Sequence, residues 1–289
     1  MGGLPAVGVV DLMVALPSSS PGDTWRHELA PLLKDGESRT AFAHPASYLY
    51  QNLPAARFAD DPVTAVLAEM DRFGVEQAMV GVDPEQAAGL DAVRAHADRF
   101  LPSIEVSPDD PVGACRRVRA GVEELGARAV TTFTAGVFPQ RRLDDPSWFP
   151  VYATCVDLGV PVFATAGVPG PRVPAWPQEV AALDTVCFEF PELVVVLRHG
   201  AEPWADLAVK LMLKWPGLHY STSAFAPRYY PRAVVDYANT RGADKVCFAG
   251  YFPMGLSYET IFEQLPSVPL RPHVWPAFLR ENARRILGL

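Results

Sequence analysis

The sequence predicts a (β/α)8 TIM barrel that forms a single domain over residues 1–289, with a long insertion after the first strand and a C-terminal helix. Eight short apolar runs, rich in β-branched residues, alternate with helical patterns along the chain. Each run is hydrophobic almost throughout, as strands covered on both faces are. The length of 289 residues fits one barrel of this kind. A doubly wound open sheet is the main alternative, and the strict alternation of eight strands favours the barrel.

The predicted strands are taken in chain order. They cover residues 7–14, 77–82, 100–106, 128–133, 160–166, 193–199, 218–222 and 245–248. The helical patterns between them begin at Asp or Pro, and two of the early ones end at Gly74 and Gly126, which are typical helix start and stop signals. The last segment, RPHVWPAFLRENARRILGL, predicts an amphipathic helix on the exterior or the base of the barrel.

Residues 17–60 form an insertion without clear periodicity, and they include the aromatic stretch HPASYLYQNLP. A connection this long in a compact domain is usually functional. Because it follows the first strand, we expect it over the C-terminal mouth of the barrel, where active sites of this fold lie. An arm that packs on a neighbouring subunit is the alternative.

Charge and cysteine content restrict the class of partner. The formal net charge is -8 and no basic stripe is present, which argues against a nucleic-acid surface. No apolar run is long enough to span a membrane and no signal peptide is recognisable. The four cysteines form no C-x-x-C pair, so free thiols in a reducing cytoplasm are predicted. The expected partner is a small-molecule substrate.

The candidate site residues come from the strand ends, because these face the mouth of a barrel. His199 is the predicted general acid/base, and Tyr251 could donate a proton or hold an oxyanion. Carboxylates to assist them and side chains to bind the substrate are also predicted: Asp11 and Glu105, and Met13, Thr165, Ser223 and Phe252. Arg198 is expected to face the helices, because its neighbour His199 faces the mouth. Each of these residues could also be purely structural, and no two histidines have metal-ligand spacing.

Several stretches resemble a known family. They are VGVVDLMVAL in the first strand and then PVFATAGVPGPRVP, FPELVVVLRHGAEPW, YSTSAFAPRYYP, RGADKVCFAGYFPMG and LRENARRILGL. The chain resembles the amidohydrolase-related family, in the branch typified by aminocarboxymuconate-semialdehyde decarboxylase and resorcylate-type decarboxylases. The resemblance covers most of the chain, is specific in the C-terminal half and is not specific over residues 15–75. It implies a hydrolase or a decarboxylase, and a homodimer.

The resemblance also implies a metal site, at positions that carry other residues here. Met13 and Ala15 stand where the family has the two histidines of its first strand. Thr165 stands at a histidine of the fifth strand, and Tyr251 at an aspartate after the eighth. Because these side chains are poor ligands for Zn²⁺ or Mn²⁺, we expect no family-type metal site and no cofactor. His199 keeps the position of a general base in the related decarboxylases.

Three functional hypotheses follow. The first is a metal-independent hydrolase or decarboxylase-like enzyme that acts on a small carboxylated metabolite, cyclic or aromatic, with His199 as acid/base and Tyr251, Asp11 or Glu105 assisting. The second is a catalytically inactive barrel that binds a metabolite or a partner protein. The third is a metal held by Glu105, His199 and an insertion histidine such as His44.

Overall fold

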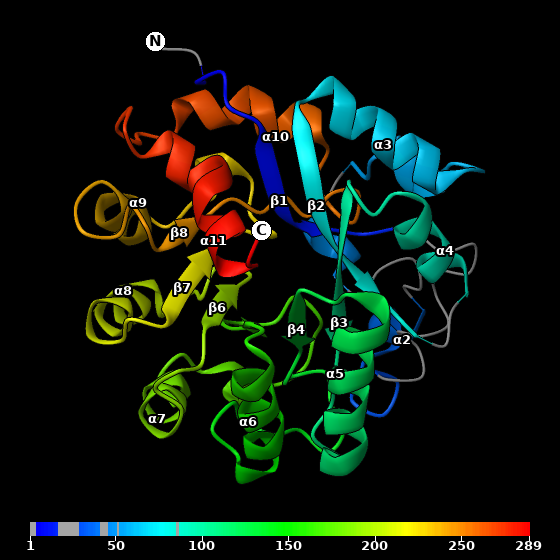
Figure 1. Ribbon diagram of the computed structural model, residues 1–289, viewed down its shortest axis with the longest axis vertical. Coiled ribbons are helices and arrows are strands. Elements are labelled where there is room, and N and C mark those ends of the chain that lie inside the picture. Colours follow the sequence, from blue (N-terminus) through cyan, green and yellow to red (C-terminus); the bar gives the residue numbers. More distant parts are fainter. Residues whose placement is uncertain (1–3, 17–28, 41–45, 51, 85–86) are drawn as a thin grey trace.

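The computed structural model describes residues 4–16, 29–40, 46–50, 52–84 and 87–289. In this part of the chain, parallel strands pair in the order β1 to β8 and form a nearly closed barrel with helices around it (Figure 1). The strands are β1 (Val9–Val14), β2 (Val75–Val82), β3 (Phe100–Glu105), β4 (Ala129–Thr132), β5 (Val162–Thr165), β6 (Val195–Arg198), β7 (Leu218–Ser221) and β8 (Val246–Cys247). The predicted TIM barrel is confirmed.

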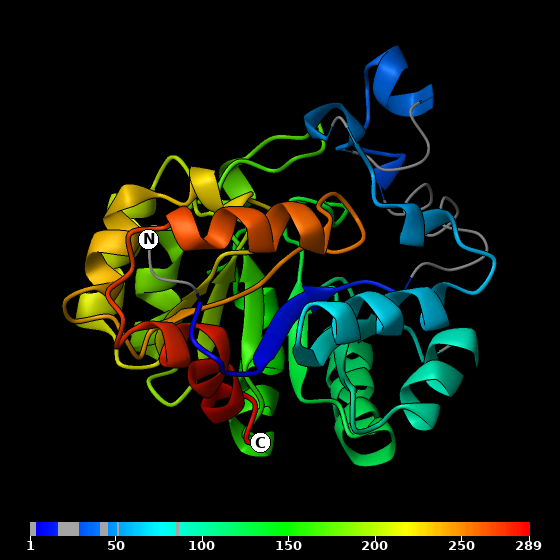
Figure 2. The ribbon, with the colours of Figure 1, turned by 90° about the horizontal axis from the view of Figure 1, so that it is seen from above.

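Helices surround the strands and also occur in the insertion (Figure 2). The α-helices are α2 (Gly36–Thr40), α3 (Pro62–Arg72), α4 (Ala87–Ala95), α5 (Pro111–Leu125), α6 (Phe149–Leu158), α7 (Ala182–Glu189), α8 (Ala205–Lys214), α9 (Arg232–Ala238), α10 (Tyr258–Gln264) and α11 (Asn282–Ile286). The 3-10 turns are η1 (Ser47–Leu49), η2 (Ala55–Phe58), η3 (Pro146–Trp148), η4 (Trp176–Gln178), η5 (Pro227–Tyr229) and η6 (Leu265–Ser267), and η7 (Ala277–Glu281) is a π-helical turn.

Helix starts follow the signals in the sequence. Asp61 caps α3 by accepting a hydrogen bond from the backbone N–H of Thr64 at 3.1 Å. Asp110 caps α5 in the same way, with the N–H of Gly113 at 3.0 Å. In both helices a proline follows the cap, where its missing N–H leaves no hydrogen bond unmade. These starts set where each helix leaves the strand before it.

The buried apolar residues form two separate clusters. The larger lies between the strands and the helices. The smaller fills the barrel interior and contains the alternate strand residues Val10, Leu12, Met79, Leu101, Ala129, Phe163, Val196, Cys247 and Ala249. Because side chains alternate along a strand, membership of the inner cluster identifies which later residues of the same strand face the mouth.

The C-terminal helix closes the base of the barrel. Ala283, Ile286 and Leu287 belong to the inner apolar cluster, so α11 packs against the strand residues inside the barrel. Figure 1 shows α11 beside β8 and close to the barrel axis. The backbone N–H of Phe248 donates to the carbonyl of Phe278 in η7 at 2.8 Å. Of the two positions predicted for this segment, the structure has the base.

The described part of the insertion contacts the loop that follows β5. The hydroxyl of Tyr48 donates to the carbonyl of Gly170 at 2.8 Å. The Nη1 atom of Arg172 lies 3.0 Å from Asp35 and 2.8 Å from Glu37. Both contacts join the insertion to the C-terminal side of the barrel, the side on which the candidate site lies.

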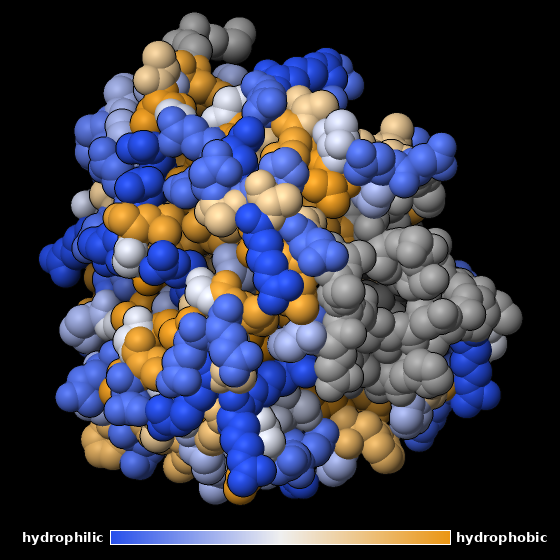
Figure 3. Space-filling model, turned by 45° about the vertical axis from the view of Figure 1, so that its right-hand side comes forward, coloured by the Kyte–Doolittle hydropathy of each residue, from blue (hydrophilic) through white to orange (hydrophobic). Residues whose placement is uncertain are grey.

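Hydrophilic and hydrophobic side chains are interspersed on the face shown in Figure 3, as is usual for a surface in contact with water. Among the described residues, none of the helices has the length and apolar character needed to cross a lipid bilayer.

Candidate active site

Arg198, the last residue of β6, points into the mouth of the barrel. Val196 of the same strand belongs to the inner cluster, and alternation puts Arg198 on the same side. Its Nη2 donates to Thr165 Oγ1 at 3.2 Å, and its Nη1 lies 3.7 Å from Met13 Sδ. Arg198 is only 6% exposed. The expectation that it faces the helices was wrong.

The reason is the backbone of His199. Its φ angle is 63°, in the left-handed region that non-glycine residues rarely adopt. The chain therefore leaves the regular strand directly after Arg198, and the next side chain does not point to the opposite face. As a result, the side chains of Arg198 and His199 both lie at the mouth of the barrel.

His199 is held from two sides. Its backbone N–H donates to Ser223 Oγ at 3.0 Å, and its ring Nδ1 lies 3.1 Å from the same oxygen. The ring of Tyr251 packs edge-on against the imidazole, with the ring centroids 5.4 Å apart. Ser223 is fully buried just beyond β7, so it fixes the orientation of the imidazole.

Tyr251 follows β8 and lies between His199 and the insertion. Its φ angle is 101°, and its backbone N–H donates to the carbonyl of Met13 at 3.0 Å. Its ring stacks on Tyr50 at 5.7 Å, and the hydroxyl of Tyr50 donates to the carbonyl of Ala224 at 3.2 Å. Tyr50 thus brings the insertion into the site, a contact that the sequence analysis missed.

Glu105 ends β3 on the inner side, in alternation with Leu101 of the inner cluster. Its side chain is exposed to water within the mouth, while the barrel walls around it displace bulk solvent. This desolvation raises the pKa of Glu105, and the positive charges of Arg198 and Arg117 oppose the rise. Arg117 itself pairs with Asp83 at 2.9 Å. A carboxyl with a raised pKa can exchange protons closer to neutral pH.

Asp11 lies apart from this group. Oδ1 accepts hydrogen bonds from the N–H groups of Gly250 at 2.8 Å and Met13 at 2.9 Å, and Oδ2 accepts from the hydroxyl of Tyr258 at 3.0 Å. Its neighbours Val10 and Leu12 face the barrel interior, so its carboxylate points outward and faces α10. Full burial raises its pKa to about 6, and the three hydrogen bonds oppose that rise.

Phe252 also lies away from the mouth. It is 1% exposed, belongs to the cluster between sheet and helices, and stacks on Tyr258 with the centroids 4.3 Å apart. The structure therefore gathers most of the predicted site residues at the mouth and leaves two of them behind the strands. Those gathered are Met13, Glu105, Thr165, His199, Ser223 and Tyr251, while Asp11 and Phe252 lie behind.

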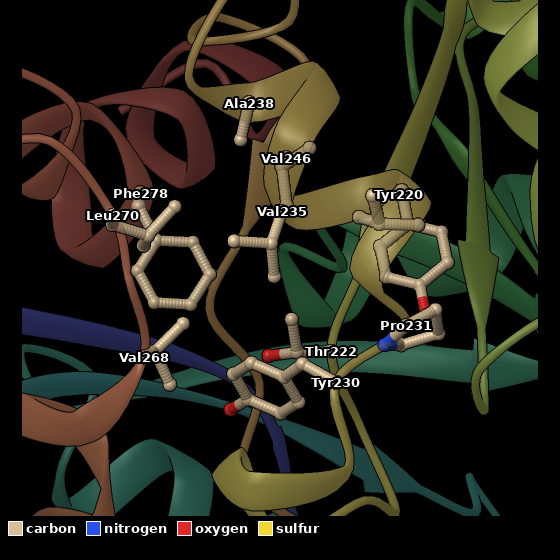
Figure 4. A pocket seen from close by; sticks show the side chains of 11 residues that line it. Tyr220, Thr222, Tyr230, Pro231, Val235, Ala238, Val246, Val268, Leu270 and Phe278 are labelled. Carbon is tan, nitrogen blue, oxygen red and sulfur yellow. The ribbon is translucent and has the colours of Figure 1, made fainter.

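A small cavity of about 10 Å³ lies elsewhere, between β7, β8 and α9 (Figure 4). Its lining is mainly apolar, and Tyr220, Val235 and Phe278 form part of it. This volume is about that of one water-sized probe, which is too small for a metabolite.

Residues 23–289 match the model of the family described as Amidohydrolase, and the chain belongs to this family. The resemblance predicted from the sequence motifs is confirmed. No curated protein matches the chain at a significant level.

Solved structures share the fold. An uncharacterised TIM-barrel protein, Bb4693 from Bordetella bronchiseptica, is 22% identical with a TM-score of 0.77, covering 98% of this chain and 99% of its own. A 5-carboxyvanillate decarboxylase from Novosphingobium aromaticivorans, with manganese and 3-methoxy-4-hydroxy-5-nitrobenzoic acid, is 14% identical with a TM-score of 0.70, covering 100% and 99%. A dihydroxybenzoic acid decarboxylase from Polaromonas, with manganese and 2-nitroresorcinol, is 15% identical with a TM-score of 0.68, covering 98% and 97%.

Family membership, with decarboxylases among these structures, supports the prediction of a hydrolase or lyase. The alternative of an inactive barrel finds no support among them. The expectation that no metal cofactor accompanies this site is contradicted, because similar structures carry bound manganese. It relied on ligand positions in this sequence alone.

The described residues of this chain do not fit manganese well. No three His, Cys, Asp or Glu side chains come together within the described ranges. Met13 and Thr165, at two of the positions where the resemblance places ligands, instead contact the guanidinium of Arg198. A thioether and a hydroxyl are poor manganese ligands. The hypothesis of a metal held with His44 falls on a residue outside the described ranges.

Proposed function

We propose that this protein is a decarboxylase-like or hydrolytic enzyme that acts on a small carboxylated metabolite, cyclic or aromatic, with His199 as the general acid/base. The observation that carries the proposal is the imidazole of His199, held by Ser223 at the mouth of the barrel between Tyr251 and the buried Arg198. The manganese-bound decarboxylases of similar fold carry nitro-aromatic ligands, which supports an aromatic substrate.

The geometry suits proton transfer beside a bound anion. Replacing a carboxylate by hydrogen requires a proton at the carbon that loses CO₂, and hydrolysis requires a proton to be taken from water and one to be given to the leaving group. An imidazole does either near neutral pH. In this proposal Tyr251 and Glu105 assist at the mouth. Asp11 acts as a positioning residue, because it holds the backbone of Met13 and Gly250.

The test is turnover by wild-type protein and the His199→Ala variant. 5-Carboxyvanillate, which carries two carboxylates, is offered first, with CO₂ release and product mass as readouts. Removing a general acid/base should lower turnover by about 100- to 10,000-fold. His273→Ala, at an exposed histidine far along the chain, is the matched control and should keep wild-type turnover. Undiminished turnover in His199→Ala would refute the assignment.

We also propose that the enzyme works in the cytoplasm and forms a homodimer. All four cysteines are free, which suits a reducing compartment. Sedimentation equilibrium of the purified protein tests the dimer, and a monomer mass would contradict it.

A further inference from the structure

The guanidinium of Arg198 is a buried positive charge with no close counter-ion in the part of the chain that the structure describes. Among the described residues, no carboxylate lies within 4.0 Å of its nitrogens, and its two side-chain contacts are the neutral Thr165 and Met13. Its Nε–H has no acceptor within the described chain. A buried charge in this state is costly unless a partner is supplied.

The surrounding residues compensate only part of the buried charge of Arg198. Burial lowers the pKa of Arg198, and the negative charge of Glu105 is the largest effect that opposes it. Yet Glu105 makes no ion pair with it and is itself exposed to water. The contact with Met13 is a weak N–H···S interaction at 3.7 Å from a flexible, half-buried side chain. An incoming acceptor can displace it.

We propose that Arg198 binds a carboxylate of the substrate at the floor of the mouth. A carboxylate matches the planar donor set of a guanidinium and would supply both the missing charge and an acceptor for unused N–H groups. The inference rests on the proposed function and adds the residue that recognises the anion. It separates the roles of two consecutive residues, with Arg198 binding and His199 transferring protons.

The pairing also restricts the substrate class. A carboxylate bound to a guanidinium is stabilised as an anion, whereas a carboxylate that leaves as CO₂ must give up its charge. Stabilising the reactant more than the transition state slows a reaction. The carboxylate on Arg198 is therefore one that survives the reaction. The substrate carries a second reacting group, which lies toward His199.

The experiment is calorimetric titration with two probes of nearly equal shape, sodium benzoate and the neutral benzamide. Wild-type protein should bind benzoate at least about tenfold more tightly than benzamide. Arg198→Met should weaken benzoate binding by about 10- to 100-fold and leave benzamide binding unchanged. Arg198→Lys, which keeps the charge but not the planar fork, should lie between. Arg119→Met is the matched control, because Arg119 pairs with Asp157 on the outer helices.

Several results would overturn the proposal: equal wild-type binding of benzoate and benzamide, no saturable benzoate binding up to its solubility limit, or unchanged benzoate binding in Arg198→Met. The wild-type comparison remains decisive even if Arg198→Met does not fold. The readouts separate this inference from the proposed function. Benzoate titration of wild type and Arg198→Met tests carboxylate binding, and turnover of His199→Ala tests acid/base catalysis, so the two failures give different results.

Discussion

Replacing Asp11 by Asn should stabilise the protein more at about pH 7.5 than at about pH 4.5. The carboxyl group of Asp11 is fully buried and its pKa is raised from 3.8 to about 6. A raised pKa in the folded state means that folding favours the protonated form. The stabilisation by this group is complete below pH 3.8 and is lost as the pH rises through about 6.

The size of the effect follows from the two pKa values. At about pH 7.5 the ionised carboxylate lowers the free energy of unfolding by about 3 kcal/mol, and at about pH 4.5 by about 1 kcal/mol. The difference between the two conditions is about 2 kcal/mol. Asn keeps an acceptor oxygen for the N–H groups of Met13 and Gly250, and the hydroxyl of Tyr258 can accept from its amide. Any change in hydrogen bonding is independent of pH and cancels in this comparison.

Urea unfolding of both proteins at both pH values measures the double difference directly. Other carboxyl groups contribute equally to wild type and variant and drop out. Asp11→Ala is the companion variant, and it should be less stable than wild type at both pH values because two buried N–H groups lose their acceptor. If the Asn variant and wild type differ by the same amount at both pH values, Asp11 ionises as it does in water and the reasoning fails.

Three further predictions use other parts of the site. Glu105→Gln should bind benzoate about 3- to 10-fold more tightly at neutral pH, because it removes a negative charge near the bound anion, and titration at several pH values should show wild type approaching the variant as Glu105 protonates. Ser223→Ala should lower kcat more than it raises KM and shift the pH profile of turnover, because the imidazole of His199 loses its hydroxyl partner. Gly167→Ala should destabilise the fold by about 1–3 kcal/mol in urea unfolding, because its φ is 101° and the new Cβ would lie 2.9 Å from the backbone of Glu202. Gly81→Ala is the control and should not destabilise the fold, because open space surrounds Gly81. Equal stabilities of the two glycine variants would refute this prediction.

The barrel itself could be predicted because each strand is a short, nearly continuous apolar run and several helices have a recognisable start signal, as α3 and α5 do. The strand limits differ from the prediction by a few residues, as in β2, which begins at Val75 instead of residue 77. The position of α11 at the base depended on apolar residues that periodicity alone assigns to a helix face. Periodicity alone could not show whether these apolar residues face the inside or the outside of the barrel.

The site was less predictable, because it depends on the direction of single side chains at strand ends and on a segment without periodicity. Asp11 was expected at the mouth, but its neighbours Val10 and Leu12 both face the barrel interior, so strand alternation sends its carboxylate outward to α10. Tyr50 belongs to an insertion without periodicity, so its stacking on Tyr251 depends on tertiary structure alone. The direction of the Arg198 side chain could have been predicted from Val196. Val196 faces the barrel interior, and counting alternate residues from it, instead of from His199, puts Arg198 on the same side.

Strained backbone positions bear on the last of these failures, the direction of Arg198 at the end of β6. Among the described non-glycine residues, a positive φ occurs at His199, Ala201, Ala224 and Tyr251. All four follow β6, β7 or β8, and two of them are proposed here to take part in catalysis. Such conformations cost about 1–3 kcal/mol each and persist only where the surrounding structure enforces them. At β6 the result is specific: a regular strand would send Arg198 and His199 to opposite faces, and the left-handed turn directs both to one mouth. The strain therefore places the proposed anion-binding cation and the proposed proton-transferring imidazole on consecutive residues at one mouth.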